Sequence, residues 1–391
     1  MNKASIDFAL SHMNDYTARL LLSAARYPDI DMPAAVQQIE GLRTAREKWP
    51  SLLQCGDYLY PPRLNREQSS SEATALHKAR LLDPVGTAAD LTGGMGIDSL
   101  FLARRAAHVD YVELSPDLCR LMEHNCRTLG VSNISIHCAD SIGWLTAADG
   151  RYDLVVADPA RRDTAGRKVV AFDDCQPNLP RHLDVILAHC DTLAVKASPM
   201  IDIDLGVSQL KQVAEVHVVA VEGECKEVLF LCRAADAEPV IHCTNLRRDG
   251  SVATSHSFNR TAEAEAPVSY CTAVGRYIYE PDASLLKGGA FRSVCVWFGV
   301  QKLDRNTHLY TSADRREPFS GRVFEVVGEV ALSAKAIRKA LPEGRASVIC
   351  RGYPEAAAHL QKRLGLADGG THTLLATTVG GRRVGFVCRQ I

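Results

Sequence analysis

Apolar residues along the chain follow two periodicities, and the change between them divides the sequence into regions. Up to about residue 60 the apolar residues recur at three- and four-residue spacing, which predicts helices. From residue 85 to about residue 236, short apolar runs alternate with helical patterns. Repeated alternation of strand and helix predicts a parallel, doubly wound sheet that carries helices on both faces.

The last two apolar runs of the alternating region lie close together. Only "EGEC" separates "EVHVVAV" from "KEVLFLCR", which predicts a hairpin that adds an antiparallel strand to the sheet. The final 70 residues show the order strand, helix, strand, helix, strand, strand, with Gly380 and Gly381 at the last turn. That order predicts a compact, ferredoxin-like α/β module, preceded by a small subdomain that contains a helix.

Composition is that of an ordinary globular protein, with 46% hydrophobic and 23% charged residues. The apolar runs are far shorter than the ~18 residues that a membrane span needs, and the first residues show no secretory pattern. We therefore expect a cytoplasmic protein without a membrane partner. The 13 cysteines show no C-x-x-C spacing, and the histidines show no metal-ligand spacing, so we expect reduced, buried thiols and no metal.

Charge is unevenly distributed along the chain. Residues 240–391 contain 21 Lys and Arg against 13 Asp and Glu, a net charge of +8, so the first 239 residues carry −9. A basic C-terminal region indicates an anionic partner. The alternative is a solvated surface with scattered arginines, and charge alone does not separate the two.

The first strand-like run ends in "DLTGGMGID", residues 90–98, a glycine loop before a helix. A triphosphate loop of the Walker A type needs a lysine, and no lysine occurs between Lys78 and Lys168. The dinucleotide fingerprint fits only in part, because Ser99 stands where the third glycine packs helix on strand. The loop therefore indicates a ligand without a phosphate at this position.

Three acidic residues end three successive strand-like runs. Asp90 precedes the glycines, where it would repel a pyrophosphate and suit a cationic group. Glu113 is placed to bind both ribose hydroxyls, and Asp140 to accept from an adenine amino group. Together they predict an adenosine with a cationic tail, such as S-adenosylmethionine. Each one alone is equally typical of a helix N-cap or a loop residue.

The fourth run ends in "VVADPARRD", where Asp158 and Pro159 occupy the position of a methyltransferase catalytic motif. An Asp and the following proline carbonyl accept hydrogen bonds from a target amine and orient its lone pair. Arg161 stands where such motifs carry a base-stacking aromatic residue. Arg161 and Arg162 can stack on a base or bind a phosphate, or they can simply pair with nearby aspartates.

The fifth run ends in "VKASP". Methylation of a pyrimidine at carbon 5 would need a cysteine nucleophile just after this strand, and Ser198 is found there, so we do not expect that chemistry. Lys196 lies at the same strand end. It is either a substrate contact or a surface lysine.

Taken together, these residues resemble those of class I S-adenosylmethionine-dependent methyltransferases that carry a THUMP-like C-terminal domain. The resemblance covers nearly the whole chain and rests on "EQSSSEATA", "DLTGGMGID", "DPARRDTAGRKV", "KASPMIDID", "YEPDASLLKGGAF" and "DGGTHTLLATT". On this basis we predict cofactor contacts by Asp90, Thr92, Gly93, Gly94, Gly96, Glu113, Leu114, Asp140, Ser141, Ser70 and Thr74. We predict that Asp158 and Arg161 are catalytic and that Pro159, Arg162 and Lys196 bind substrate.

The resemblance implies a mixed α/β chain in four parts. We expect a helical N-terminal region at 1–65, a Rossmann-like methyltransferase domain at 66–236, a linker with a small ferredoxin-like subdomain at 237–320, and a THUMP-like domain at 321–391. THUMP domains bind RNA, in agreement with the basic C-terminal region. The predicted function is methylation of a tRNA or rRNA base by direct displacement, with Asp158 as acceptor or base.

Three other functions are compatible with parts of the pattern. A methyltransferase that acts on a small molecule or a protein would keep every cofactor residue and make the C-terminal charge incidental. A catalytically silent RNA-binding protein would have no reason to keep the three strand-end acids together with the Asp-Pro motif. A nicotinamide-dependent oxidoreductase would be revealed by titration with that cofactor.

Overall fold

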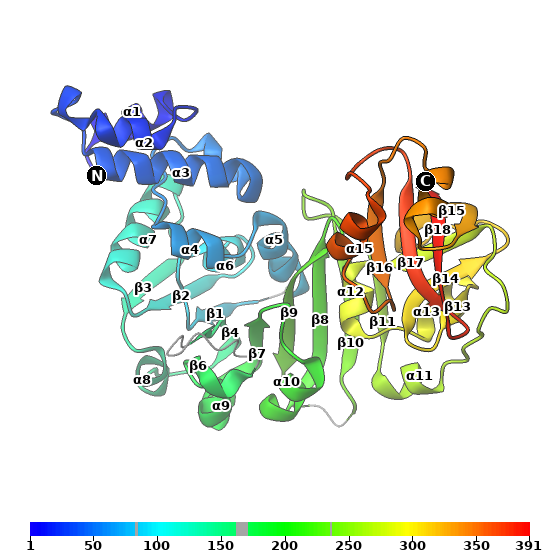
Figure 1. Cartoon of the computed structure of the whole chain (residues 1–391). Coiled ribbons are helices and arrows are strands. Elements are labelled where there is room, and N and C mark those ends of the chain that lie inside the picture. The colour runs from blue at the N-terminus through cyan, green and yellow to red at the C-terminus, as the bar shows by residue number, and fades with distance from the viewer. Residues whose placement is uncertain (83–84, 162–170, 235–236) are drawn as a thin grey trace. The chain divides into compact units, whose positions relative to one another are not determined.

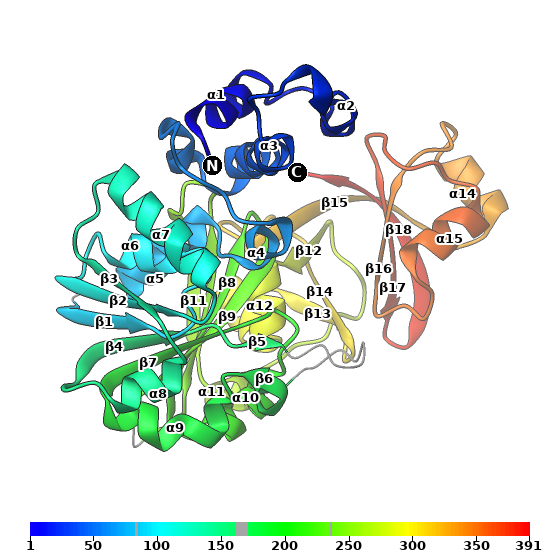
Figure 2. The ribbon, with the colours of Figure 1, turned by 90° about the vertical axis from the view of Figure 1, so that its left-hand side faces the viewer.

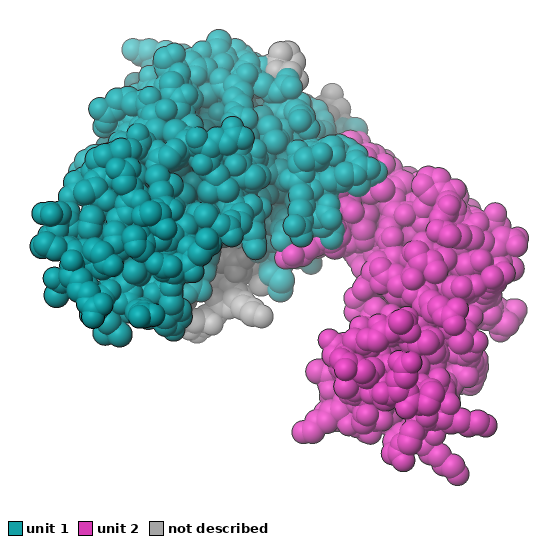
Figure 3. All heavy atoms as spheres, turned by 90° about the horizontal axis from the view of Figure 1, so that it is seen from above, with its two compact units in different colours: residues 1–222, 226–239, 246–253 teal, residues 223–225, 240–245, 254–391 magenta. Residues whose placement is uncertain are grey.

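The computed structural model describes the chain except residues 83–84, 162–170 and 235–236. Two compact units make up the chain, coloured separately in Figure 3. The first unit contains residues 1–222, 226–239 and 246–253, and the second contains residues 223–225, 240–245 and 254–391.

The first unit begins with helices, as predicted. They are α1 (Lys3–Ser11), α2 (Thr17–Leu22), α3 (Met32–Lys48), α4 (Arg63–Gln68) and α5 (Glu72–Leu81), with short 3-10 turns at Ala24–Arg26 and Pro50–Gln54. In Figure 1, α1 and α2 lie against α3. Asp31 caps α3 by accepting from the backbone N–H of Ala34 at 3.2 Å, and Pro33 fits the first turn because it needs no hydrogen bond there.

A large sheet follows, and its strands alternate with helices on both faces (Figures 1 and 2). Its strands are β1 (Thr87–Asp90), β2 (His108–Glu113), β3 (Ile134–Cys138), β4 (Tyr152–Ala157), β7 (Cys190–Ala197), β8 (Val213–Val221), β9 (Glu224–Cys232), β10 (Val240–Leu246) and β11 (Val252–Phe258), in the order β11-β10-β8-β9-β7-β4-β1-β2-β3. From β3 to β7 the neighbours are parallel, whereas β9 runs antiparallel to β7. The predicted doubly wound sheet with an antiparallel strand is confirmed.

The sheet extends further than the sequence pattern indicated. No strand was predicted directly after residue 236, yet β10 and β11 continue the sheet. The segment "VATSHSF" of β11 is polar and largely exposed, so it lacks the apolar alternation by which strands are recognised.

The helices of the sheet have clear sequence boundaries. They are α6 (Ile97–Leu102), α7 (Pro116–Leu129), α8 (Ser141–Thr146), α9 (Leu179–Ala188) and α10 (Ile203–Leu210), with a 3-10 turn at Phe172–Asp174 and a small ribbon of β5 (Ala160–Arg161) and β6 (Cys175–Gln176). Helix α7 begins after Ser115, whose hydroxyl caps Leu118 N–H. It ends at Gly130, which adopts the left-handed conformation that closes a helix, at φ 69°.

The second unit contains a seven-stranded sheet. Its elements are α11 (Arg260–Glu265), β12 (Tyr277–Pro281), α12 (Ala283–Gly288), α13 (Ser293–Phe298), β13 (Gln301–Asp304), β14 (Thr307–Ser312), β15 (Gly321–Val330), α14 (Ala334–Ala340), β16 (Ser347–Arg351), α15 (Ala357–Leu364), β17 (Thr373–Val379) and β18 (Arg382–Gln390). The strand order is β13-β14-β12-β15-β18-β17-β16. Gly380 and Gly381 form the turn between β17 and β18, both with positive φ, as the hairpin pattern predicted.

No helix in the part of the chain that the structure describes is long and apolar enough to cross a membrane.

Candidate functional site

The glycine loop between β1 and α6 is built on close approaches that only glycine permits. A Cβ on Gly93 would lie 2.2 Å from the ring of Tyr111, and one on Gly96 would lie 2.3 Å from the sulfur of Met122. Gly94 and Gly96 also adopt positive φ, at 54° and 81°. The loop therefore packs its backbone tightly onto β2 and α7 at the carboxyl edge of the sheet.

Asp90 ends β1 beneath this loop, and only 3% of its surface is exposed. Its carboxylate accepts from Ser99 Oγ at 2.6 Å and from the backbone N–H of Thr92 at 3.1 Å. Burial raises the pKa of Asp90 to about 6, although the bond from Ser99 acts in the opposite direction. Ser99, which departs from the dinucleotide fingerprint, thus serves as a hydrogen-bond donor to Asp90.

Glu113 ends β2 beside the same loop. Its two carboxylate oxygens accept from the backbone N–H groups of Gly94 and Ser115, both at 2.8 Å. A carboxylate offers about four acceptor positions, so two backbone donors leave capacity for a ligand. The neighbouring Leu114 is 71% exposed and presents an apolar surface at this strand end.

Asp140 follows β3 and caps α8. It accepts from the backbone N–H of Gly143 at 2.8 Å, and the side chain is exposed. The structure therefore shows the N-cap role that the sequence offered as an alternative for this acid, and Ser141 is the first residue of α8. Because β1, β2 and β3 are adjacent and parallel, Asp90, Glu113 and Asp140 all lie at one edge of the sheet.

Asp158 follows β4 and is held from two sides. Its backbone N–H donates to Thr92 Oγ1 at 2.7 Å, and its carboxylate forms an ion pair with Lys196 of β7. The side chain of Lys196 is 11% exposed, so the alternative of a surface lysine is wrong. Burial by itself would lower the pKa of Lys196, but the charges of Asp158, Asp98 and Glu227 raise it overall, so the amine stays protonated.

A second buried ion pair lies close by and was not anticipated. Lys78 of α5 donates to both carboxylate oxygens of Glu227 of β9 at 2.9 and 2.8 Å, and the two side chains are 3% and 2% exposed. Lys78 Nζ also lies 3.1 Å from the carboxylate of Asp98. The signal in the sequence concerns Lys78 alone, which follows the buried Thr74 by four residues on one face of α5.

The segment before α5 packs against the start of α6. Ser70 Oγ donates to Asp98 at 2.7 Å and accepts from Lys78 at 2.9 Å, and Trp49 Nε1 donates to the Ser70 carbonyl at 2.7 Å. Thr74 Oγ1 donates to the backbone carbonyl of Ser71 at 3.1 Å. Ser70 and Thr74, both predicted to contact the cofactor, are buried, and Ser70 is bonded directly to the helix that follows the glycine loop. Their contacts with the cofactor stay predictions.

The basic residues after Asp158 are described only in part. Pro159 is buried, and the backbone of Arg161 pairs with Cys175 across the ribbon of β5 and β6. Arg162 lies outside the described residues, as does the side chain of Arg161. Their proposed contacts with substrate stay predictions.

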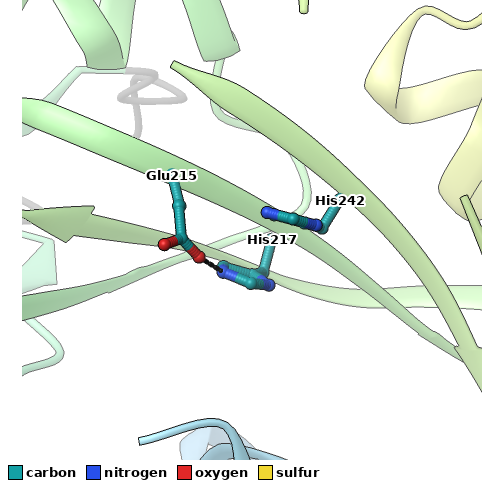
Figure 4. Close-up of side chains that lie close together, drawn as sticks. All are labelled: Glu215, His217 and His242. Carbon is teal, nitrogen blue, oxygen red and sulfur yellow. Dashed lines mark hydrogen bonds and ion pairs between the residues drawn. The ribbon is translucent and has the colours of Figure 1, made fainter. Parts of the chain in front are cut away.

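Strand β8 carries a further pair of polar side chains, shown in Figure 4. The ring of His217 lies against Glu215, with Nε2 at 2.9 Å from the carboxylate. Arg233 also forms an ion pair with Glu215. Glu215 therefore gives the buried ring of His217 a polar partner, and Arg233 balances the charge of Glu215. His242, also labelled there, belongs to the second unit and contacts Ser257 Oγ at 2.8 Å.

Family models match two parts of the chain. A ferredoxin-like domain matches residues 277–319, and a THUMP domain-like family matches residues 321–390. A crystal structure from Porphyromonas gingivalis W83, described as that of a methyltransferase, is similar over 99% of this chain and 97% of that one. The two are 31% identical, with a TM-score of 0.86.

Similarity also extends to proteins known from their sequences. An uncharacterized S-adenosylmethionine-dependent methyltransferase of Mycobacterium tuberculosis is 26% identical over 331 residues, which cover 83% of this chain and 87% of that protein. The 23S rRNA (uracil(1939)-C(5))-methyltransferase RlmD of Hahella chejuensis is 32% identical over 111 residues, 23% of this chain and 24% of that one.

Proposed function

Because this chain belongs to the class I S-adenosylmethionine-dependent methyltransferases that carry a THUMP-like C-terminal domain, we propose that it methylates a nitrogen atom of an RNA base. RNA is proposed as the substrate because the THUMP-like region is positively charged. Residues 322–389 contain 11 Lys and Arg against 5 Asp and Glu, a net charge of +6. Most of the positive excess of the C-terminal part is therefore concentrated in this module.

Two helices of the module present these charges. Lys335, Arg338 and Lys339 are exposed on α14 at spacings that place them on one face, and Lys362 is exposed on α15. Helices α14 and α15 pack side by side on the same sheet (Figure 2). Among the residues with described side chains, none of these four forms an ion pair with a carboxylate, so their charges are available to phosphate groups.

The four-part division of the chain remains a proposal. The family matches at 277–319 and 321–390 support a ferredoxin-like part and a THUMP-like part near the predicted positions. Strands β10 and β11 favour an end of the methyltransferase sheet beyond residue 236, inside the region that the sequence pattern assigned to a linker.

The residues at the strand ends fit the cofactor. S-adenosylmethionine supplies an electrophilic methyl group when it is bound. Asp90 is a buried carboxylate without a cation beside it among the described residues, and it suits the positively charged end. Glu113 retains acceptor capacity for hydroxyl groups, and Leu114 offers an apolar surface for a base. We propose these three, with the remaining predicted loop and helix contacts, as the binding residues.

Asp158 is proposed to orient the acceptor nitrogen. One of its carboxylate oxygens is bound to the protonated amine of Lys196, which holds the carboxylate in one direction. The other oxygen can accept from an N–H of the base and so orient the nitrogen lone pair. A carboxylate oxygen that is held in this way can accept only from a donor, which favours an acceptor nitrogen that carries an N–H, such as an amino group.

Carbon-5 methylation of uracil, the reaction named for the Hahella relative, is a less suitable model. Ser198 follows β7, where that chemistry would need a cysteine. A serine hydroxyl is far less nucleophilic than a thiolate unless a base activates it. Nitrogen as the acceptor therefore agrees better with the residues of this chain.

The test uses tritiated S-adenosylmethionine and RNA from cells that lack this gene. We expect label in RNA, and we expect Asp158→Ala to reduce the transfer rate by about 10²- to 10⁴-fold while the cofactor affinity changes little. Asp191→Ala is the matched control, because Asp191 is an exposed carboxylate paired with Arg151.

Two results would contradict the proposal. Label confined to protein or to small molecules would exclude RNA as the acceptor. Loss of cofactor binding in Asp158→Ala would place Asp158 in the cofactor pocket and remove its role at the acceptor nitrogen.

A further inference from the structure

A cavity of about 440 Å³ lies between α5 and α6 of the first unit. It is lined by Leu76, Ala79, Arg80, Phe101, Arg104 and Arg105. Half of these residues are arginines and none is acidic. Such a lining is unusual in this part of the chain, because the first 239 residues carry a net charge of −9.

Two of the three arginines, Arg80 and Arg104, form no ion pair with a carboxylate among the described residues. Arg80 Nη1 donates to the backbone carbonyl of Gly250 at 3.0 Å, and the guanidinium of Arg104 lies over the ring of Phe101, 4.0 Å from its centroid. Both arginines are exposed, and each guanidinium has five N–H donors. Arg105 interacts with other residues of the chain, so Arg80 and Arg104 are the two arginines of the cavity that are available to an anion.

A turn beside the cavity adds to the positive charge. Arg247 and Arg248 precede Gly250, the residue whose carbonyl binds Arg80. The acidic residue of the turn, Asp249, accepts from the backbone N–H and the hydroxyl of Ser251 at 2.8 and 2.6 Å. The turn thus places two more arginines near α5, with one carboxylate already engaged in hydrogen bonds.

The cavity is separate from the reaction centre. Helix α6 begins at the glycine loop and ends at Leu102, a length of about 9 Å at 1.5 Å per residue, and Arg104 follows its far end. The negative end of a helix dipole attracts cations and explains single basic residues at such positions. It does not explain a cavity in which several guanidinium groups converge.

We propose that this cavity, which we name the arginine pocket, binds phosphate groups of the RNA substrate at a distance from the methylated base. The inference rests on the proposed function, because it takes RNA as the substrate. Guanidinium groups bind phosphate oxygens through paired hydrogen bonds. A free nucleoside carries no phosphate group, so the pocket would select RNA over free nucleosides.

The experiment measures the affinity of the full-length protein for a fluorescein-labelled 30-nucleotide RNA over a range of salt concentrations. We expect Arg80→Gln/Arg104→Gln to weaken binding about tenfold and to lower the salt slope by about 1 to 2, since each lost phosphate contact removes 0.7 to 0.9. Arg19→Gln/Arg26→Gln is the matched control, because it removes two exposed arginines of the N-terminal helices. Cofactor affinity should be unchanged in both variants.

A charge-conserving variant separates phosphate binding from folding. Arg80→Lys/Arg104→Lys should keep most of the salt slope and lose part of the affinity, because lysine does not form the paired contacts. An equal effect of the pocket variant and the control variant would overturn the proposal. Loss of binding to inorganic phosphate with RNA affinity unchanged would also overturn it and would assign the pocket to a small phosphate compound.

The same experiments distinguish an error about the arginine pocket from an error about RNA methylation. If label still appears in RNA and depends on Asp158 while the pocket variant binds RNA normally, only the arginine pocket is wrong. If the wild-type protein neither binds nor labels RNA, both proposals are wrong.

Discussion

Basic residues are buried and paired around the strand-end site, by which we mean Asp90, Glu113 and Asp158 with the glycine loop, whereas they are exposed and unpaired on two helices of the THUMP-like module. In the first unit, Lys78 and Lys196 are buried and each is matched by a carboxylate. On the THUMP-like module, Arg338 and Lys339 are exposed and form no ion pair among the described residues. Matched buried charges fix the geometry of a site, whereas exposed, unmatched charges are available to an external anion. The difference separates cations whose charge is neutralised within the protein from cations whose charge is open to solvent, and we propose that the latter contact RNA.

Removal of the buried cation Lys78 should have the largest effect. Lys78→Met leaves Glu227 and Asp98 without their common cation in a buried environment, and we expect a loss of about 3 to 5 kcal/mol in the free energy of unfolding. Urea unfolding measures it. The double variant Lys78→Met/Glu227→Leu should recover much of the loss. Arg151→Met, which breaks an exposed pair, should cost less than about 1 kcal/mol. Equal losses in the two single variants would contradict the distinction.

The second effect concerns activity. Lys196→Met should lower kcat by about 100-fold, equivalent to about 2.7 kcal/mol, because Asp158 loses the ammonium group that orients its carboxylate. KM for RNA should change little, and Lys196→Arg should restore part of the rate. Lys211→Met, at an exposed position after α10, is the control. A large rise in KM with kcat unchanged would identify Lys196 as a substrate contact.

Asp90 differs from both groups of charges, because it is a buried carboxylate with no cation paired to it among the described residues. Its folded-state pKa of about 6 lies above the ordinary value near 3.9. Between these values the folded protein holds a proton that the unfolded chain has released. Stability should therefore fall by roughly 2 to 3 kcal/mol as pH rises from about 4 to about 6. Asp90→Asn should remove this slope in urea unfolding at pH 4 to 7, and an unchanged slope would show that another group causes it.

The smallest effect concerns the exposed cations of α14. Arg338→Gln/Lys339→Gln should weaken RNA binding about tenfold, or about 1.4 kcal/mol, with a lower salt slope. Arg276→Gln/Arg382→Gln removes two arginines that are already paired with Glu325 and Glu329, and it should have less effect. Titration with labelled RNA measures both. Equal losses would mean that only net charge matters.

The sequence predicted those site residues whose positions follow from the order of strands and helices along the chain. Asp90 and Glu113 each end a strand of the sheet and Asp158 directly follows one, and parallel strands bring their carboxyl ends to one edge. The cofactor contacts of Asp90, Glu113 and Asp140 stay predictions, and Asp140 shows an N-cap bond that any such position can adopt. The hydrogen bond from Ser99 to Asp90 could not be predicted, because the dinucleotide motif expects glycine at this position and assigns no function to a hydroxyl group.

The contacts that were missed join distant parts of the chain. Lys78 and Glu227 are 149 residues apart, and no local pattern identifies such a pair. Lys196 was correctly placed at a strand end, but periodicity did not decide whether its amine points to solvent or to Asp158. Strands β10 and β11 were missed because β11 is mostly polar and exposed. A strand of that kind lacks the alternation of apolar residues by which strands are predicted.

The position of β9 has a consequence for how the protein is made. This strand inserts between β7 and β8, and it carries Glu227, the partner of Lys78. A nascent chain that has emerged from the ribosome only to residue 212 has Asp98 but not Glu227 beside Lys78, and its β7 has an open edge. We expect the glycine loop of such a chain to be less firmly held, because Lys78 contacts Asp98 in the first turn of α6. The buried ion-pair network of the first unit is therefore complete only after β9 has been synthesised.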